Sequence, residues 1–558
     1  MKRLSILPLF VLLLTAVDVP PSQSLTPTFL ETLEVKVTSL DVIVTDRAGH
    51  PVTGLRRDAF EVRDDNRPQE VTNFTEYSGS SGTSQLGPAA SDDAPPARHF
   101  VFFIDEMSLH PETRKRLLHD VVTFMNTSMR PGDEAMVVTP ASPDKLALNF
   151  TGDRDAVAAK LKEYIAKQTF RADAVTESEE LYLKSVSRGV GNRIATRPYA
   201  ERVNRRVTST LRTLLGFAGG LAQTPGRKVF VLVTTSLTAH PGDEAFGGRA
   251  VRRYDYRPIA LSFASHETID EVVDRSGNRI YFDATPMIRE LGAIASANGI
   301  TIYTLQPSLG FRISPPGLGA DSKNTGTFPV SRLHEVELQG TKETLGSLAS
   351  ATGGKYFLGA DTMDDAFSQL AKDVSTYYSL GYRTPASGDG SIRRISVTVK
   401  GRPDLTVRTR RDLMDRSPSR EMDEQTAATL FAPSPVNELA MKATASSPNR
   451  ERRGVFYDID VAITFPLEKL TFVPVDGGMY RASFAVHYAA ADAADYTTGV
   501  TREQIVQVAA ADLDREIKKS YTYTTRLVIS PGTAKVAVGV MDKASRLSSF
   551  ERIVVEAR

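Results

Sequence analysis

The chain has 558 residues, of which 41% are hydrophobic and 24% are charged. This balance is that of an ordinary globular protein, and the length predicts three or four domains. The formal net charge of +1 argues against a general nucleic-acid-binding protein, which would need a clear basic excess. The absence of cysteine excludes disulfides, thiolate metal sites, a cysteine nucleophile and a cysteine-linked lipid anchor.

Residues 1–24 predict a secretory signal peptide. Lys2 and Arg3 precede an apolar run over residues 4–17, which is short for a membrane span, and small residues before position 24 suit a cleavage site. The alternative is an uncleaved N-terminal anchor. No other segment approaches the length of a membrane span. We therefore expect an exported protein, periplasmic or extracellular, with no membrane span after signal cleavage.

Residues 25–78 contain short alternating strands and predict a small β domain. Residues 79–97 are rich in Ser, Gly, Ala, Pro and Asp without apolar periodicity, which is typical of a linker. From 98 to 380, strands alternate with amphipathic helices. The apolar run that ends at Asp105 is expected to open an α/β sheet, and the strand 228–235 is expected to be buried on both faces, as the strands of parallel sheets are.

The carboxyl-terminal part of the chain has a different pattern. Residues 381–413 alternate apolar and polar side chains around Gly401, which predicts a β-hairpin extension. Residues 414–435 are polar with scattered Ser, Pro and Ala, and predict a second linker. Residues 436–558 contain regularly spaced strands and turns, which favour a β-sandwich.

Three long segments are predicted to be insertions in the 98–380 region, namely residues 167–200, 239–285 and 307–340. Loops of this length in a compact domain are usually functional or disordered. Residues 248–258 hold four arginines and two tyrosines, residue types that are favoured at binding surfaces. A solvated loop without a partner explains this composition equally well.

The strand that ends at Asp105, the turn Pro131-Gly132-Asp133 and the strand from Val229 to Thr235 resemble a von Willebrand factor A domain. With Asp46-Arg-Ala-Gly-His-Pro-Val-Thr-Gly-Leu55 near the N-terminus, the chain resembles the bacterial VWFA-related secreted proteins described mainly from acidobacteria. The resemblance implies an α/β fold with a von Willebrand A-like (Rossmann-like), doubly wound and mostly parallel sheet. The small β domain and the β-sandwich would flank it.

In the A domains that bind metal, an Asp-x-Ser-x-Ser loop and an acidic residue after a later strand hold Mg²⁺. The corresponding loop here runs from Asp105 to Leu109, with Met107 and Leu109 at the serine positions. The later acidic position is taken by Thr235, followed by Ser236. The resemblance therefore implies a degenerate site for Mg²⁺ or Mn²⁺. Its candidate metal ligands are Asp105 and Ser108, and its candidate ligand-binding residues are Asp105, Ser108, Thr235 and Ser236.

The alternative role for Asp105 is structural, as a carboxylate favoured by the positive end of the following helix. No catalytic set accompanies it. His266-Glu267 lacks the second histidine of a zinc-protease helix, and neither a Gly-x-Ser-x-Gly elbow nor a phosphate-binding glycine loop occurs.

We therefore expect an exported, non-enzymatic binding or adhesion module that contacts a protein or surface ligand through the carboxyl-end face of its α/β sheet. The alternative is a metal-independent structural or assembly component of a cell-envelope complex.

Overall fold

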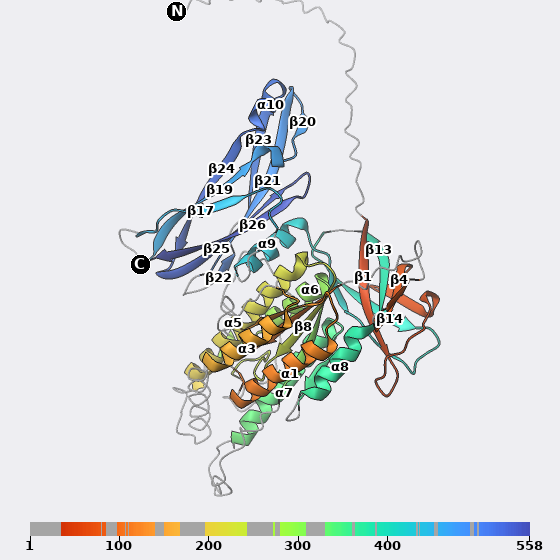
Figure 1. Cartoon of the computed structure of the whole chain (residues 1–558). Coiled ribbons are helices and arrows are strands. Elements are labelled where there is room, and N and C mark those ends of the chain that lie inside the picture. The colour runs from red at the N-terminus through yellow and green to blue at the C-terminus, as the bar shows by residue number, and fades with distance from the viewer. Residues whose placement is uncertain are drawn as a thin grey trace, which may run out of the picture.

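The computed structural model shows three groups of elements, which lie at the right, bottom and top of Figure 1. The described residues are 35–79, 81–84, 97–105, 108–109, 111–139, 150–167, 196–242, 272–273, 280–307, 330–359, 363–385, 388–430, 434, 436–450, 456–491, 496–498 and 501–557. No helix within these ranges is both long and apolar enough to cross a membrane.

A parallel sheet of five strands forms the centre of the molecule. Its strands, in spatial order, are β12 (Tyr356–Leu358), β11 (Ile300–Gln306), β8 (Arg227–Val233), β6 (Arg98–Ile104) and β7 (Glu134–Val138). Every residue of β6, β8 and β11 is buried. These runs can be apolar throughout because both faces of the sheet are covered.

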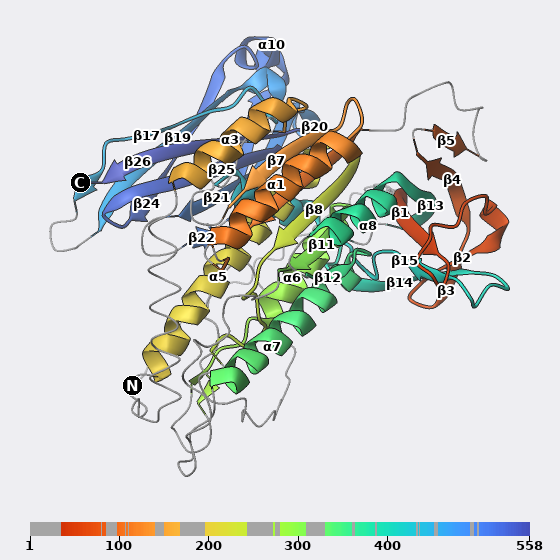
Figure 2. The same ribbon diagram turned by 60° about the horizontal axis from the view of Figure 1, so that its bottom comes forward.

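Helices cover the two faces of this parallel sheet. One face packs against α1 (Pro111–Ser128), α3 (Arg154–Lys167) and α8 (Asp364–Ser375). The other face packs against α5 (Thr196–Gly220), α6 (Thr285–Ala297) and α7 (Val330–Ala351). Figure 2 shows α5 and α7 extending beyond the carboxyl ends of the strands.

The amino-terminal β unit combines segments from residues 35–84 and 376–414. One of its sheets has the order β15 (Thr406–Arg408), β1 (Val35–Thr45), β13 (Thr376–Pro385), β4 (Val71–Ser78) and β5 (Ser81–Ser84). The other has the order β16 (Asp412–Met414), β14 (Ile392–Val399), β2 (Phe60–Asp64) and β3 (Arg67–Gln69). A shared core that includes Phe60, Phe74 and Tyr378 joins the two sheets.

The carboxyl-terminal β unit, residues 436–557, also consists of two antiparallel sheets around one core. One sheet contains β17 (Lys442–Ala445), β18 (Asn449–Arg450), β19 (Tyr457–Pro466) and β24 (Ser520–Ile529). The other contains β20 (Val473–Val475), β21 (Met479–Ala491), β22 (Tyr496–Thr498), β23 (Arg502–Ala509), β25 (Gly532–Asp542) and β26 (Ser548–Ala557). A short helix, α10 (Leu513–Glu516), precedes β24.

The predicted fold class, a von Willebrand A-like and mostly parallel doubly wound sheet, is wrong for this chain. Most of the described strands lie in antiparallel sheets, and one sheet of five strands is parallel. The strand at the end of the expected α/β region, β13, leaves that region and pairs with β1 and β4. Apolar periodicity identifies a strand without identifying its partners, and the pairing of distant segments overturned this prediction.

The second predicted linker, residues 414–435, is also corrected. It contains α9 (Pro418–Thr429), which begins with the Ser417 side chain accepting a hydrogen bond from the Arg420 backbone N–H. Met422, Ala427 and Ala428 are buried between neighbouring elements. The composition looked polar because the buried face of α9 uses small side chains and threonine rather than a row of leucines.

Several other predictions fall on residues outside the described ranges. The signal peptide does so entirely, as do most of the first linker and the Arg- and Tyr-rich stretch 248–258. The three predicted insertions are described only at their ends. The described ends include the first turn of α5 and most of the first half of α7, which were expected to be loop.

Candidate binding site at the carboxyl edge of the parallel sheet

The register of the parallel sheet aligns three polar residues at its carboxyl edge. Val233 of β8 is opposite Ile104 of β6 and opposite Leu305 of β11. The next residue of each strand, respectively Thr234, Asp105 and Gln306, therefore lies in one row across the sheet edge. All three side chains are buried. Carboxyl ends of parallel strands are the usual place for a binding site in such sheets.

Asp105 is hydrogen-bonded to the end of the neighbouring strand. The Thr234 hydroxyl donates to Asp105 Oδ2 at 2.7 Å, and the Asp105 backbone N–H donates to the Val233 carbonyl at 2.9 Å. Ser108 Oγ donates to the Asp105 carbonyl at 3.0 Å and lies 3.3 Å from Thr234 Oγ1. The carboxylate, Ser108 and Thr234 therefore form one buried polar cluster between β6 and β8.

Thr235 and Ser236 complete this cluster in different ways. Thr235 donates twice to Ser108, from its backbone N–H to Oγ at 3.1 Å and from its hydroxyl to the carbonyl at 2.5 Å. Ser236 donates its backbone N–H to Thr234 Oγ1 at 3.3 Å. The structure thus brings Asp105, Ser108 and Thr235 together, whereas Ser236 contacts the cluster through its backbone N–H.

Thr234 is the residue of this cluster that the sequence analysis missed. It directly follows the last apolar residue of β8, in the same register position as Asp105 after β6. Alternation along β8 places it on the same face as Phe230 and Leu232. The alternation of side chains along β8 therefore predicts Thr234 as the neighbour of Asp105, whereas the family motif points to Thr235.

The alternative role of Asp105 as a cap of the following helix is not what its contacts show. The first helical residue of α1 is Pro111, so Asp105 lies outside the capping positions of that helix. Its carboxylate accepts a hydrogen bond from the Thr234 hydroxyl of the neighbouring strand. Asp105 is therefore hydrogen-bonded to the carboxyl edge of the sheet, through Thr234 and Val233.

The described residues of this cluster do not fit a resident Mg²⁺ or Mn²⁺. Such an ion needs several converging oxygen ligands, and Asp105 supplies the one carboxylate in this group. The Thr234 hydroxyl directs its proton at that carboxylate, and Ser108 Oγ accepts the Thr235 N–H. No group of three or more His, Asp or Glu side chains suited to a metal occurs among the residues that the structure describes.

Further along the same edge, two buried polar atoms lack a hydrogen-bond partner within the described part of the chain. Gln306 is fully buried; its Oε1 accepts from the Tyr356 hydroxyl at 2.6 Å, whereas its Nε2 has no acceptor. Thr139 directly follows β7 and is buried, and its hydroxyl also has no hydrogen-bond partner among the described residues. A buried donor without an acceptor costs about 1–3 kcal/mol, so such atoms usually mark a position where a ligand or water binds.

The segment after Thr234 runs between the long helices of one face. Ala239 donates its N–H to Thr344 Oγ1 on α7 at 2.9 Å, and its carbonyl accepts from Ala284 at the start of α6. Gly242 lies against Ala200 of α5, where a Cβ on residue 242 would meet Ala200 at 2.6 Å. This packing fixes residues 235–242, which follow β8, against α5, α6 and α7, and it covers one side of the polar edge.

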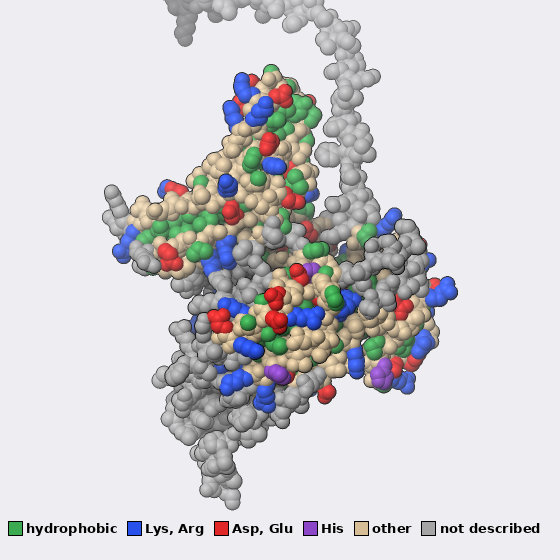
Figure 3. Space-filling model, in the orientation of Figure 1, with side chains coloured by type: hydrophobic (Ala, Val, Ile, Leu, Met, Phe, Trp, Pro, Cys, Tyr) green, Lys and Arg blue, Asp and Glu red, His purple; other side chains and the backbone are tan. Residues whose placement is uncertain are grey.

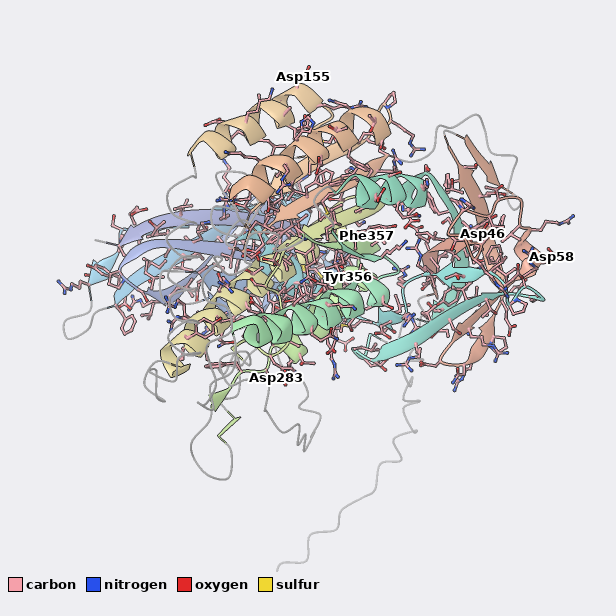
Figure 4. All side chains as sticks on the ribbon, turned by 90° about the horizontal axis from the view of Figure 1, so that it is seen from below. Asp46, Asp58, Asp155, Asp283, Tyr356 and Phe357 are labelled. Carbon is pink, nitrogen blue, oxygen red and sulfur yellow. The ribbon has the colours of Figure 1, made fainter. Side chains whose placement is uncertain are left out.

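Asp283 marks the rim of this edge. Its Oδ1 accepts from the Thr285 N–H at the start of α6, at 2.8 Å, and lies 3.9 Å from His240 Nδ1. Figure 4 shows Asp155 on the side of α3 and Asp283 on the side of α7, with Tyr356 and Phe357 of β12 between them. Asp155 follows Thr151, which bridges to Ala135 near the start of β7, so it lies at the amino end of the sheet. On the face drawn in Figure 3, acidic and basic side chains are interspersed, in keeping with the net charge of +1.

Comparisons with known proteins do not identify the chain. No protein family and no curated protein matches it. Among solved structures, a Northeast Structural Genomics Consortium target, SoR45, is 12% identical over 22% of this chain and 88% of its own, with a TM-score of 0.14. The putative ApaA protein from Bordetella pertussis is 9% identical over 22% of this chain and 98% of its own, also at 0.14.

The human COPII-coat protein Sec24c is 10% identical over 62% of this chain, with a TM-score of 0.22. The match spans 49% of the Sec24c chain. TM-scores at this level do not show a shared fold.

Proposed function

We propose that this chain is an exported, non-enzymatic binding protein that contacts a protein or surface ligand through the carboxyl edge of its parallel sheet. The observation that carries the proposal is the row of Asp105, Thr234 and Gln306, where the buried Gln306 amide has a donor without an acceptor in the described structure. A ligand carbonyl or carboxylate at this edge would accept that hydrogen bond.

The surroundings of the row support contact with a large partner rather than with an isolated small molecule. Helices α5 and α7 extend beyond the strand ends and form the two sides of this edge (Figure 2). Exposed residues near the rim, such as Asp283, lie within reach of a macromolecule seated between them. The mixed surface charge gives no preference for a polyanion.

One observation favours the alternative, a metal-independent assembly component of a cell-envelope complex. The contacts among Asp105, Ser108, Thr234 and Thr235 join β6 to β8. A cluster of this kind stabilises the sheet edge whether or not a ligand binds there.

Site-specific cross-linking tests the proposal, because the chain has no native cysteine to interfere. Asp283→Cys at the carboxyl edge and Asp155→Cys at the opposite end would each carry a thiol-reactive photo-crosslinker. Both positions lie at the amino-terminal ends of helices, so Asp155→Cys is a matched control. The labelled full-length chains would be irradiated with a cell-envelope fraction from the organism that makes the protein.

We expect a discrete cross-linked product from position 283, and none from position 155, that excess unlabelled chain competes away. Products from position 155 alone, or equally from both positions, would contradict binding at the carboxyl edge. A product from position 155 that persists in a Thr234→Val background would support the assembly alternative.

A further inference from the structure

A second polar cluster lies at the opposite end of the parallel sheet, where α8 and β13 join the amino-terminal β unit (Figure 2). It contains Arg227 at the start of β8, Tyr303 of β11, Asp373 of α8, Asp41 of β1 and Arg408 of β15. Arg227, Tyr303 and Asp373 are buried, with relative side-chain exposures of at most a few per cent. None of these residues belongs to the carboxyl-edge site.

Asp373 is the common neighbour of the two arginines. Arg408 Nη2 donates to Asp373 Oδ2 at 2.7 Å, and Gln369 Nε2 donates to Oδ1 at 3.2 Å. Arg227 donates to the Asp373 carbonyl at 3.4 Å and to the Val374 carbonyl at 3.2 Å. Both carboxylate oxygens of Asp373 therefore already accept a hydrogen bond.

Asp41 is the other carboxylate of the cluster, and cations outnumber it. Arg227 Nε lies 3.2 Å from Asp41 Oδ2. Burial lowers the pKa of nearby Lys228 to about 8, with Asp41 opposing the change and Arg410 adding to it. Arg410 is partly buried and donates to the carbonyls of Ser39 and Ser296. Arg227, Lys228 and Arg410 therefore all lie near the single carboxylate of Asp41, and the junction has an excess of positive charge.

Several donors of the cluster have no acceptor in the described structure. They include the Tyr303 hydroxyl and Arg408 Nη1, and Arg227 Nε lies outside hydrogen-bond geometry with Asp41. The Tyr303 hydroxyl is fully buried, and burial together with Asp373 raises its pKa, so the phenol keeps its proton and remains a donor. Asp373, Arg227 and Arg408 are all electrostatic neighbours of this hydroxyl.

We propose that this cluster, which we call the junction site, binds a small monovalent inorganic anion of the size of chloride between Tyr303, Arg408 and Arg227. An anion accepts hydrogen bonds from all three groups and offsets the excess positive charge. A water molecule could accept the same hydrogen bonds, but it is neutral and would not offset the excess positive charge. Tyr303 lies in the same apolar cluster as Leu370 and Val374, which limits access of bulk water to the site.

The test is thermal unfolding of the full chain at constant ionic strength, with sodium gluconate replaced stepwise by sodium chloride or sodium bromide. Binding to the native state raises the unfolding midpoint by mass action. At ten times the dissociation constant we expect a rise of about 1–2 °C, which then continues to grow with the logarithm of the halide concentration. Tyr303→Phe, which removes the hydroxyl alone, should lose at least half of this rise.

Tyr356→Phe is the matched control, because it removes a partly buried tyrosine hydroxyl that bonds to Gln306 at the carboxyl edge rather than to the junction site. Its halide response should equal that of the unsubstituted chain. Arg408→Lys keeps the charge and removes the second guanidinium donor, and it should weaken the response in the same way as Tyr303→Phe.

A midpoint that rises in proportion to the halide concentration rather than to its logarithm, or a rise that Tyr303→Phe leaves intact, would overturn the proposal and leave water as the occupant. Crystals of the full chain soaked in bromide provide an independent readout. Anomalous density between Tyr303 and Arg408 would support the site, and its absence at saturating bromide would refute it.

Discussion

Thr234 explains how a carboxylate can be buried at the end of an apolar strand. Asp105 follows seven buried residues of β6 and would lose its hydration without a compensating donor. The Thr234 hydroxyl supplies that donor at 2.7 Å and accepts the Ser236 N–H in turn. A single hydroxyl therefore satisfies groups on two strands, and the cluster keeps its geometry without a metal.

Thr234→Val tests this role because valine has nearly the same shape and lacks the hydroxyl. We expect the free energy of unfolding to fall by about 1–3 kcal/mol, since the Asp105 carboxylate and the Ser236 N–H each lose a partner. Chemical denaturation followed by circular dichroism measures this change. Thr524→Val, on the exposed face of β24, is the control and should change stability by less than about 0.5 kcal/mol. An equal effect of the two substitutions would contradict the assigned role.

Helix α9 is the element that joins the parallel-sheet region to the carboxyl-terminal β unit. Its Ala427 packs against Ala489 and Ala537, and its Met422 packs against Met541 and Phe550. On its other side, α9 lies directly against Gly219 and Gly220 of α5. Small side chains on both partners permit this close approach, which explains why the segment lacks the apolar pattern of an ordinary amphipathic helix.

Gly219→Ala tests the close approach of α5 and α9. A Cβ at residue 219 would lie 2.9 Å from the Glu424 carbonyl oxygen, so one helix must shift. We expect a loss of about 1–3 kcal/mol in the free energy of unfolding, as for other overpacked positions. The matched control is Gly346→Ala in α7, where a Cβ would meet nothing within 4 Å.

For Gly346→Ala we expect a gain of about 0.5–1 kcal/mol from helix propensity. Denaturation curves of the two variants should therefore move in opposite directions. If Gly219→Ala were also stabilising, α9 would not be packed against α5 in solution as described.

Across the whole molecule, charged residues gather where the three groups of elements meet. The junction site lies between the amino-terminal β unit and the parallel sheet. A second group lies around α9, where Arg416 and Arg420 contact Glu424 at 2.6 and 3.2 Å, and Arg420 also lies 3.9 Å from Glu290 of α6. On the far side of α9, Asp423 lies 2.6 Å from the buried His487 of β21. Such contacts are more specific in geometry than apolar packing and favour one arrangement of the units.

Glu290 makes one of these interfaces dependent on pH. Burial against α9 raises its pKa to about 7 from 4.5; Arg420, at 3.9 Å, opposes the rise and Glu424 adds to it. The native carboxyl therefore holds its proton to a higher pH than the unfolded one. This contribution to stability is fully present below about pH 4.5 and is lost as the pH rises through about 7.

We accordingly expect Glu290→Gln to remove this contribution to the pH dependence and to stabilise the protein above pH 7 by about 1–3 kcal/mol. Thermal unfolding midpoints of the two chains between pH 4.5 and 8 measure the effect. Glu343→Gln, an exposed position on α7, should leave the pH profile unchanged. Parallel profiles for Glu290→Gln and the unsubstituted chain would contradict the assignment.

Local patterns predicted several elements and part of the site. The apolar run 98–104 and the strand near 228–233 are confirmed as β6 and β8. A short, mostly apolar run of seven residues is typical of a strand that is buried on both faces. The predicted site residues Asp105, Ser108 and Thr235 lie in one cluster, and their role in binding remains a prediction. The proposed partner class, export and family resemblance remain predictions.

What the residues determine alone is therefore local: where strands and helices begin and end, and which polar groups follow an apolar strand. Tertiary structure decided which strands pair. The partners of β1 lie more than three hundred residues away in β13 and β15, and no short-range period carries that information. The same holds for Gln306, Arg408 and Tyr303, whose environments arise when distant segments exclude water around them. Burial and register are properties of the assembled sheets, and they decide the chemistry of both sites.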